Sequence, residues 1–97
     1  MERRRERAWQ VARRAAALLR DRFGATRVVA FGSLARGEGF TRWSDVDIAA
    51  WGISPSDTFR AVAAVLDVDS EIQVNLVDVA ICRPALLASI ERDGIDL

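Results

Sequence analysis

Apolar residues recur at three- and four-residue spacing through the first part of the chain, as on one face of a helix. The spacing predicts a helix over residues 2–22, and this segment is rich in Ala, Arg and Leu, which are strong helix formers. Gly24 follows the last apolar position and is a typical helix stop. The predicted apolar stripe consists of Ala8, Ala12, Ala15, Ala16, Leu19 and Phe23.

Three later segments have patterns that are typical of strands. Residues 27–31 are apolar almost without alternation, which indicates a short strand buried on both faces. Residues 45–51 and 71–80 alternate, so each presents one largely apolar face and one with polar residues. On the second of these strands, Gln73 and Asn75 share the polar face. A glycine-rich turn over residues 32–39 and a loop over residues 40–44 join the first two strands.

Two further helices complete the pattern. Ser56 or Asp57 can cap a helix that runs to about Leu66, and Pro84 suits the first turn of a last helix that Gly94 ends. The predicted inner faces consist of Phe59, Val62, Ala63 and Leu66 on the first helix, and of Leu86, Leu87, Ile90 and Ile95 on the last. The order of elements is typical of a small α/β or α+β domain.

Composition excludes several kinds of chemistry. The 97 residues, enough for one domain, include no His, no Lys and a single Cys, Cys82. These absences exclude triads that need His, Schiff-base lysines, a Walker-type lysine, intrachain disulfides and zinc clusters. The longest uncharged stretch has nine residues, 48–56, whereas a membrane-spanning helix needs about 20. We expect a cytoplasmic protein that does not bind membranes.

Charge is divided unevenly along the chain. Residues 2–22 hold eight Arg and three acidic residues, a balance of +5, and the remainder has a balance of −5. We expect the basic helix to face either the acidic remainder of its own domain or an acidic partner. The neutral total gives no reason to favour a nucleic-acid partner.

The candidate chemistry lies around the first two strands. Asp45 and Asp47 are two residues apart on a predicted strand, so their carboxylates point to one face and can converge on a divalent cation. Upstream, Gly32 and Ser33 follow a buried strand at a tight turn, where backbone N–H groups favour phosphate. Arg36 adds a fixed positive charge there. It can contact phosphate oxygens or brace the turn by a salt bridge.

At this point the residues resemble a known family. The runs Gly32-Ser33-Leu34-Ala35-Arg36-Gly37 and Ser44-Asp45-Val46-Asp47-Ile48 are similar to the signature of minimal nucleotidyltransferases in the DNA polymerase β-like superfamily. The resemblance implies a single domain over residues 1–97, with a short mixed sheet of three to four strands and helices packed on one side. It also implies nucleotide binding by Gly32, Ser33, Arg36 and Ser44, Mg²⁺ at one or two sites on Asp45 and Asp47, and transfer of a nucleoside monophosphate.

The resemblance also suggests partners. The short chain and its C-terminal run, residues 90–95, are similar to antitoxin-type members, which pair with small helical HEPN-type proteins. The implied substrates are ATP or another nucleoside triphosphate, with the partner protein as acceptor. An oligomer is compatible with this reading.

The sequence departs from the family at one position. A third carboxylate is expected on the later strand, where this chain has Asn75. An amide cannot take a proton from an attacking hydroxyl, which is the usual assignment of the third acid. Asp78 lies three residues further on and is expected on the opposite face of a regular strand.

Three hypotheses follow. The first is an Mg²⁺-dependent nucleotidyltransferase that acts on a protein. The second is a catalytically weak or inactive module of the same fold that binds a partner or nucleotide without turnover. The third is an RNA-binding accessory that uses the Arg-rich helix, and binding that falls steeply with salt would support it. Trp51, at the end of the second strand, can stack on a base or pack against the domain.

Overall fold

The computed structural model describes residues 2–37 and 44–97, so the end of the expected glycine-rich turn, residues 38–39, and all but the last residue of the expected loop over residues 40–44 lie outside the described residues. Helix α1 spans Glu2–Phe23, close to the predicted range. The other elements are β1 (Arg27–Phe31), α2 (Gly32–Arg36), β2 (Val46–Trp51), α3 (Thr58–Leu66), β3 (Val74–Asp78), α4 (Pro84–Asp93) and β4 (Ile95–Asp96). Single 3₁₀ turns, η1 (Pro55–Asp57) and η2 (Val79–Ile81), precede α3 and follow β3.

The strands form one mixed sheet in the order β3-β2-β1-β4. Strand β1 pairs antiparallel with β2 and β4, and β2 pairs in parallel with β3. The predicted α/β class is thus confirmed. The register places Phe31 opposite Asp47 and Asn75 beside Asp47, so the ends of three elements meet at one corner of the sheet.

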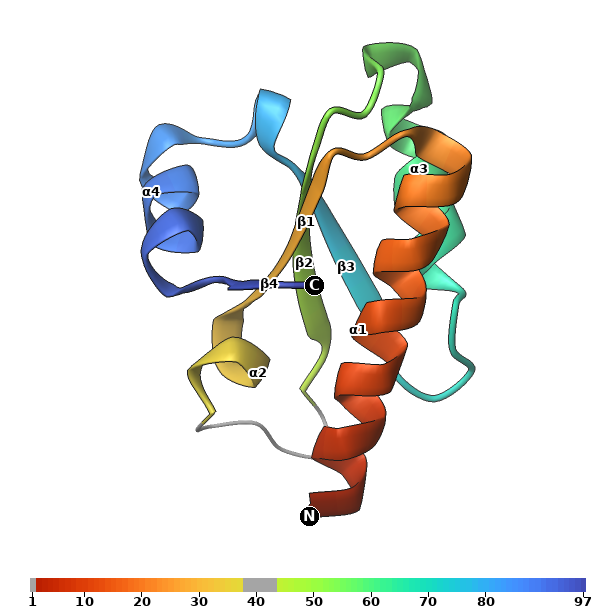
Figure 1. Cartoon of the computed structure of the whole chain (residues 1–97), viewed down its shortest axis with the longest axis vertical. Coiled ribbons are helices and arrows are strands. Elements are labelled where there is room, and N and C mark those ends of the chain that lie inside the picture. The colour runs from red at the N-terminus through yellow and green to blue at the C-terminus, as the bar shows by residue number, and fades with distance from the viewer. Residues whose placement is uncertain (1, 38–43) are drawn as a thin grey trace.

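The two faces of the sheet are covered differently. Helices α1 and α3 lie side by side on one face, over the main core. Helix α4 lies on the other face, where Ile90 packs against Val29 and Ala49 (Figure 1). The expectation that the helices pack on one side is therefore wrong for α4.

Helix α3 presents a different face to the sheet from the one predicted. Its buried residues are Thr58, Ala61 and Val65, whereas Phe59 is 85% exposed. The helix begins only at Thr58, after η1, and the Thr58 hydroxyl donates to Asp78 Oδ2 at 2.7 Å. This buried hydrogen bond orients Thr58 toward β3 and turns Phe59 outward.

The third strand is shorter than predicted, and the chain end adds a fourth. The Asp69 carboxylate accepts from the backbone N–H groups of Glu71 and Ile72, which holds those residues in a turn before β3. At the other end, Asp78 accepts from the N–H of Ala80 and starts η2. Ile95, predicted on the apolar side of the last helix, instead forms β4 because Gly94 ends α4.

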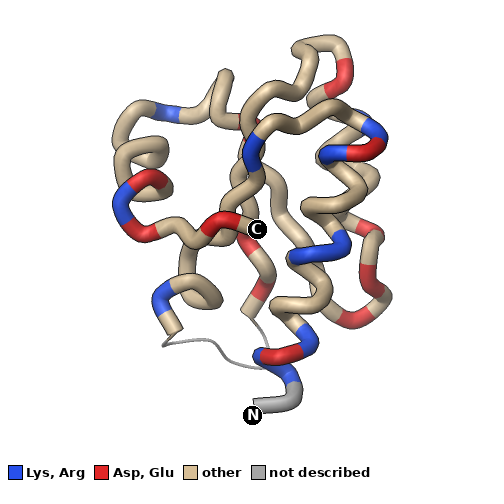
Figure 2. Tube along the Cα trace, viewed as in Figure 1, with Lys and Arg blue, Asp and Glu red and all other residues tan. Residues whose placement is uncertain are grey.

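The basic helix contacts the acidic part of its own domain. Arg7 Nη2 lies 3.0 Å from Asp69 Oδ1 and 3.3 Å from Glu71 Oε1, and Arg14 Nη2 lies 3.7 Å from Asp69 Oδ1. Figure 2 shows the basic positions along α1 and acidic ones on the loop between α3 and β3. Part of the Arg-rich helix therefore faces the acidic remainder of its own domain, which is the first of the two alternatives that the charge division predicted. In the described part of the chain, no helix has the length and apolar character needed to cross a membrane.

We predict that Asp69→Asn costs about 1–3 kcal/mol of unfolding free energy at pH 7, because charge-assisted hydrogen bonds from Arg7 and from the N–H groups of Glu71 and Ile72 are weakened or lost. Burial opposes ionisation of Asp69, but the N–H groups of Glu71 and Ile72 and the Arg7 guanidinium outweigh it and lower the pKa of Asp69. A lowered carboxyl pKa stabilises the fold above the pKa of the unfolded chain, and this contribution disappears as pH falls through the folded pKa.

Urea denaturation at pH 7, 4 and 2.5 checks this prediction. The difference between the unaltered chain and Asp69→Asn should shrink toward low pH. The exposed neighbour Asp67 supplies the control, and Asp67→Asn should change stability little at any pH. A difference for Asp69→Asn that stays constant with pH would contradict the assigned role.

Candidate active site

The candidate site begins where β1 ends. After Phe31 the chain turns at Gly32, which has a φ of +74°. A Cβ atom at this position would lie 2.8 Å from Asp47 Oδ2. Because L-residues rarely adopt this φ and a side chain would collide with Asp47, only glycine fits here without a shift. The turn backbone therefore approaches the Asp47 carboxylate closely.

The turn continues as the short helix α2, anchored by the buried side chain of Leu34. Ser33 is half-buried in its first turn, where helix N–H groups have no partner within the helix. Gly37 ends the helix at a φ of +77° and donates its N–H to Ser33 O at 3.2 Å. We refer to residues 32–37 as the glycine turn.

Asp45 and Asp47, here called the acid pair, lie at the start of β2. Asn75 Nδ2 donates to Asp45 Oδ2 at 3.2 Å and to Asp47 Oδ1 at 3.4 Å. The two carboxylates therefore converge on one atom, and the amide of Asn75 stands between them. The structure thus brings together Gly32, the acid pair and Asn75.

The environment makes Asp47 harder to ionise than an exposed acid. Burial raises the pKa of Asp47, and the nearby charge of Asp45 raises it further. The hydrogen bond from Asn75 and the charge of Arg36 act in the opposite direction. Arg36 is exposed at the end of α2 and so contributes positive charge to the site.

Other candidate residues are placed as follows. Ser44 is half-buried immediately before Asp45. Asp78, 5% exposed, lies on the opposite face of β3 and is bonded to Thr58 and Ala80. Trp51 lies at the far end of β2 from the acid pair, with the Arg27 guanidinium 4.5 Å from its ring centroid. Of the two roles predicted for Trp51, the structure supports packing against the domain.

Two residues of the site were not identified from the sequence. Gln73 Nε2 donates to Asn75 Oδ1 at 2.9 Å and so orients the amide that faces the acid pair. The shared strand face of Gln73 and Asn75 is the signal that could have identified it. Arg5 Nη1 donates to Gly37 O at 3.2 Å, from a helix far away in sequence, and no sequence pattern indicates this contact.

The oxygen donors suit a divalent cation. Mg²⁺ prefers carboxylate and carbonyl oxygens, and Asp45 Oδ2 and Asp47 Oδ1 already face one point. Within residues 2–37 and 44–97, no group of three or more His, Cys, Asp or Glu side chains is arranged to hold a metal. The third position at this site is the amide of Asn75, whose carbonyl is a weaker oxygen donor than a carboxylate.

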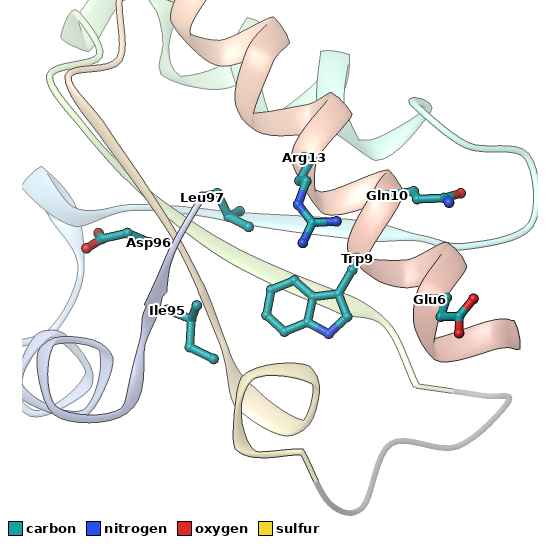
Figure 3. A pocket seen from close by; sticks show the side chains of 7 residues that line it. All are labelled: Glu6, Trp9, Gln10, Arg13, Ile95, Asp96 and Leu97. Atoms are coloured by element: carbon teal, nitrogen blue, oxygen red, sulfur yellow. The ribbon is translucent and has the colours of Figure 1, made fainter. Parts of the chain in front are cut away.

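A hollow of about 520 Å³ lies between α1 and the chain end. Trp9 and Arg13 from α1 and Ile95 and Leu97 from the C-terminal segment line it (Figure 3). Neither member of the acid pair lines this hollow, so it is separate from the candidate site.

Comparison with known proteins identifies the family. The family model described as the nucleotidyltransferase domain matches residues 12–95, which include the glycine turn, the acid pair and Asn75. The chain belongs to the nucleotidyltransferase domain family. A search of curated proteins gave no match.

Solved structures with a similar fold include two toxin–antitoxin complexes. One contains AMP-PNP (21% identity, TM-score 0.71, 88% of this chain and 70% of that chain). The other is a mutant of the MntA-HpeT pair (24% identity, TM-score 0.69, 88% and 69%). A third, described as a minimal nucleotidyltransferase, has 29% identity and a TM-score of 0.59 over 99% of this chain and 91% of its own. The fold of this nucleotidyltransferase domain is thus shared with proteins of toxin–antitoxin systems.

We predict that Gly32→Ala in this nucleotidyltransferase domain abolishes or strongly weakens Mn²⁺ binding by the acid pair, because the new methyl group must displace Asp47. It should also cost about 1–2 kcal/mol of stability from the left-handed backbone. Titration calorimetry and urea denaturation measure the two effects.

Gly24 offers a matched control, since its φ is +70° and a Cβ there would meet nothing within 4 Å. Gly24→Ala should carry a similar stability cost and leave Mn²⁺ binding unchanged. Equal Mn²⁺ affinity in the two variants would contradict the close approach of Gly32 and Asp47.

Proposed function

We propose that the chain is a nucleotidyltransferase that uses a divalent cation, Mg²⁺, to transfer AMP from ATP to a protein partner. We further propose that this partner is the toxin of a toxin–antitoxin pair, of the small helical HEPN type. The observation that carries the proposal is the convergence of Asp45 and Asp47 on one point beside the glycine turn. The shared fold with toxin–antitoxin proteins supports the choice of partner.

In this proposal the acid pair holds the cation, which supplies positive charge to the phosphate oxygens when bound. The N–H groups of the glycine turn and the Ser33 hydroxyl bind the triphosphate, and Arg36 adds a charge that does not titrate. An acceptor hydroxyl forms a bond to the α-phosphorus, the bond to the bridging oxygen breaks, and pyrophosphate leaves. The chemistry requires mainly positioning and charge, so it needs neither His nor Lys.

Exposed apolar side chains favour a protein partner. Phe59 is 85% exposed and Ile81 74% exposed, and with Ile53 and Pro55 they line an apolar hollow of about 210 Å³. Large apolar residues grouped on a surface commonly mark a protein contact. We propose that the partner covers this patch.

Asn75 favours a second candidate function, a module that binds nucleotide or partner with little or no turnover. Its Nδ2 stands between the two carboxylates, where it offsets their repulsion without a cation. The amide cannot accept a proton from the attacking hydroxyl, which must then be lost to solvent or to a base on the acceptor. Slow transfer is therefore expected even if the first proposal holds.

Transfer from ATP labelled at the α-phosphate tests the proposed function. The purified chain is incubated with the label, Mg²⁺ and the protein encoded by the adjacent gene. We predict label on that protein, and its loss with Asp45→Ala plus Asp47→Ala. The exposed acids Asp67 and Asp93 provide a control pair, whose replacement by Ala should leave transfer intact. Transfer that survives loss of the acid pair would remove the assigned site.

Substitution at Asn75 separates the two candidate functions. Asn75→Asp restores a carboxylate of nearly equal volume beside the acid pair, and general-base assistance is typically worth about 10²–10⁴-fold. We therefore predict an increase in the transfer rate of at least about an order of magnitude. Asp78→Asn should leave the rate per folded molecule unchanged, because Asp78 lies on the other face.

The single-turnover rate of label transfer measures both effects. Loss of transfer in Asp78→Asn with no effect of Asn75→Asp would contradict the assignment. Nucleotide binding without transfer in the unaltered chain and in Asn75→Asp would favour the binding module.

A further inference from the structure

Arg5 connects the basic helix to the glycine turn. Its Nη1 donates to Gly37 O at 3.2 Å, and its Nη2 lies 2.9 Å from the point where a Cβ of Gly37 would be. The guanidinium therefore rests directly against Gly37, which can be approached this closely because it has no side chain. Gly37 in turn donates its N–H to Ser33 O, so Arg5 contacts the residue that ends α2.

The glycine turn needs such external support. A helix of only five residues is too short to be stable on its own, so contacts with the rest of the domain must fix its position. Its start is fixed because it follows directly on β1, and its middle is fixed by the buried Leu34. Arg5 holds its end. The turn is thereby fixed between β1 and α1.

The same contact gives a role to the Arg-rich run that the proposed function left unused. Arg7 reaches Asp69 and Glu71 before β3, while Arg5 reaches the glycine turn. These two neighbours on α1 thus join the helix to two different segments that lead into the candidate site. Both residues therefore connect α1 to other segments of the domain. Arg13 differs from them, because it is exposed and its guanidinium carbon lies 5.8 Å from the ring centroid of Trp9 on the same helix.

We propose that Arg5 is a positioning residue for nucleotide binding, a role that rests on the proposed function. By fixing Gly37 it holds the glycine turn in the orientation in which the N–H groups at its start face the triphosphate beside the acid pair. Loss of Arg5 should weaken nucleotide binding and leave the acid pair itself intact, because Asp45, Asp47 and Asn75 do not depend on Gly37.

ATP binding measured by titration calorimetry in the presence of Mg²⁺ tests this role. Arg5→Ala should raise the Kd for ATP about three- to tenfold, as expected for loss of one solvent-exposed hydrogen bond of ordinary strength. Arg13→Ala removes the same charge from the same helix and should change the Kd less than about twofold, since exposed charges are screened by salt. Binding of Mn²⁺ without nucleotide should be equal in both variants and in the unaltered chain.

Hydrogen exchange of the Gly37 amide distinguishes positioning from simple charge attraction. We expect faster exchange in Arg5→Ala and unchanged exchange in Arg13→Ala. Arg5→Lys keeps the charge but not the planar guanidinium, and should recover ATP affinity only to the extent that it slows Gly37 exchange. Full recovery of affinity while Gly37 exchanges as fast as in Arg5→Ala would overturn the proposal.

The other outcomes are also decisive. ATP binding that Arg5→Ala leaves unchanged would overturn the role of Arg5 alone. Absence of ATP binding by the unaltered chain would contradict the proposed function, and with it the nucleotide role of Arg5. Equal loss of ATP affinity in Arg5→Ala and Arg13→Ala would reduce the effect to net charge and would likewise overturn the proposal.

Discussion

The close approach of Gly32 to Asp47 is the constraint on which the candidate site depends. With a φ of +74° and only 2.8 Å between a hypothetical Cβ and Asp47 Oδ2, this position accepts a side chain only if the Asp47 carboxylate moves. The approach follows from the antiparallel pairing of β1 with β2, which sets Phe31 opposite Asp47. It places the start of a helix beside a carboxylate, an arrangement that joins a phosphate-binding element to a cation-binding one.

Hydrogen bonding explains how two neighbouring carboxylates are tolerated in the acid pair. Two carboxylates on one strand face repel each other, and burial raises the pKa of Asp47. Asn75 Nδ2 donates to both, and Gln73 fixes the orientation of that amide through Asn75 Oδ1. The amide thus relieves a repulsion that a third carboxylate would increase. Asn75 also lacks the proton acceptor that a carboxylate at this position would supply, so it eases the repulsion within the acid pair at the expense of catalytic rate.

Local patterns were sufficient for the parts of the fold that depend on neighbours in sequence. The continuous apolar run at residues 28–31 falls within β1, and the alternation predicted for the later strand placed Asn75 and Asp78 on opposite faces, as the structure has them. The prediction of which face of α3 packs on the sheet was wrong, because a buried hydrogen bond between Thr58 and Asp78 sets the rotation of this helix. The two residues are distant in sequence, so no local pattern indicates their contact. Strand β4 was missed because two residues carry no periodic signal.

The contacts that the Arg residues of α1 make near the site could likewise not be predicted from local patterns. The charge split indicated that α1 meets acidic residues, but not which Arg reaches which partner. Arg5 meets a backbone carbonyl, which no charge pattern can indicate. Asp69 combines two backbone N–H groups with Arg7, and this combination becomes visible only when α1 is packed against the turn before β3.

The most direct test of the central claim is a crystal structure grown with Mn²⁺ and a non-hydrolysable ATP analogue, with anomalous scattering used to locate the metal. The account predicts an anomalous peak bound by Asp45 and Asp47, with the triphosphate against the glycine turn and the Asn75 amide displaced from its present contacts. Nucleotide bound elsewhere, or an acid pair still bridged by Asn75 Nδ2 with no metal beside it, would contradict the account.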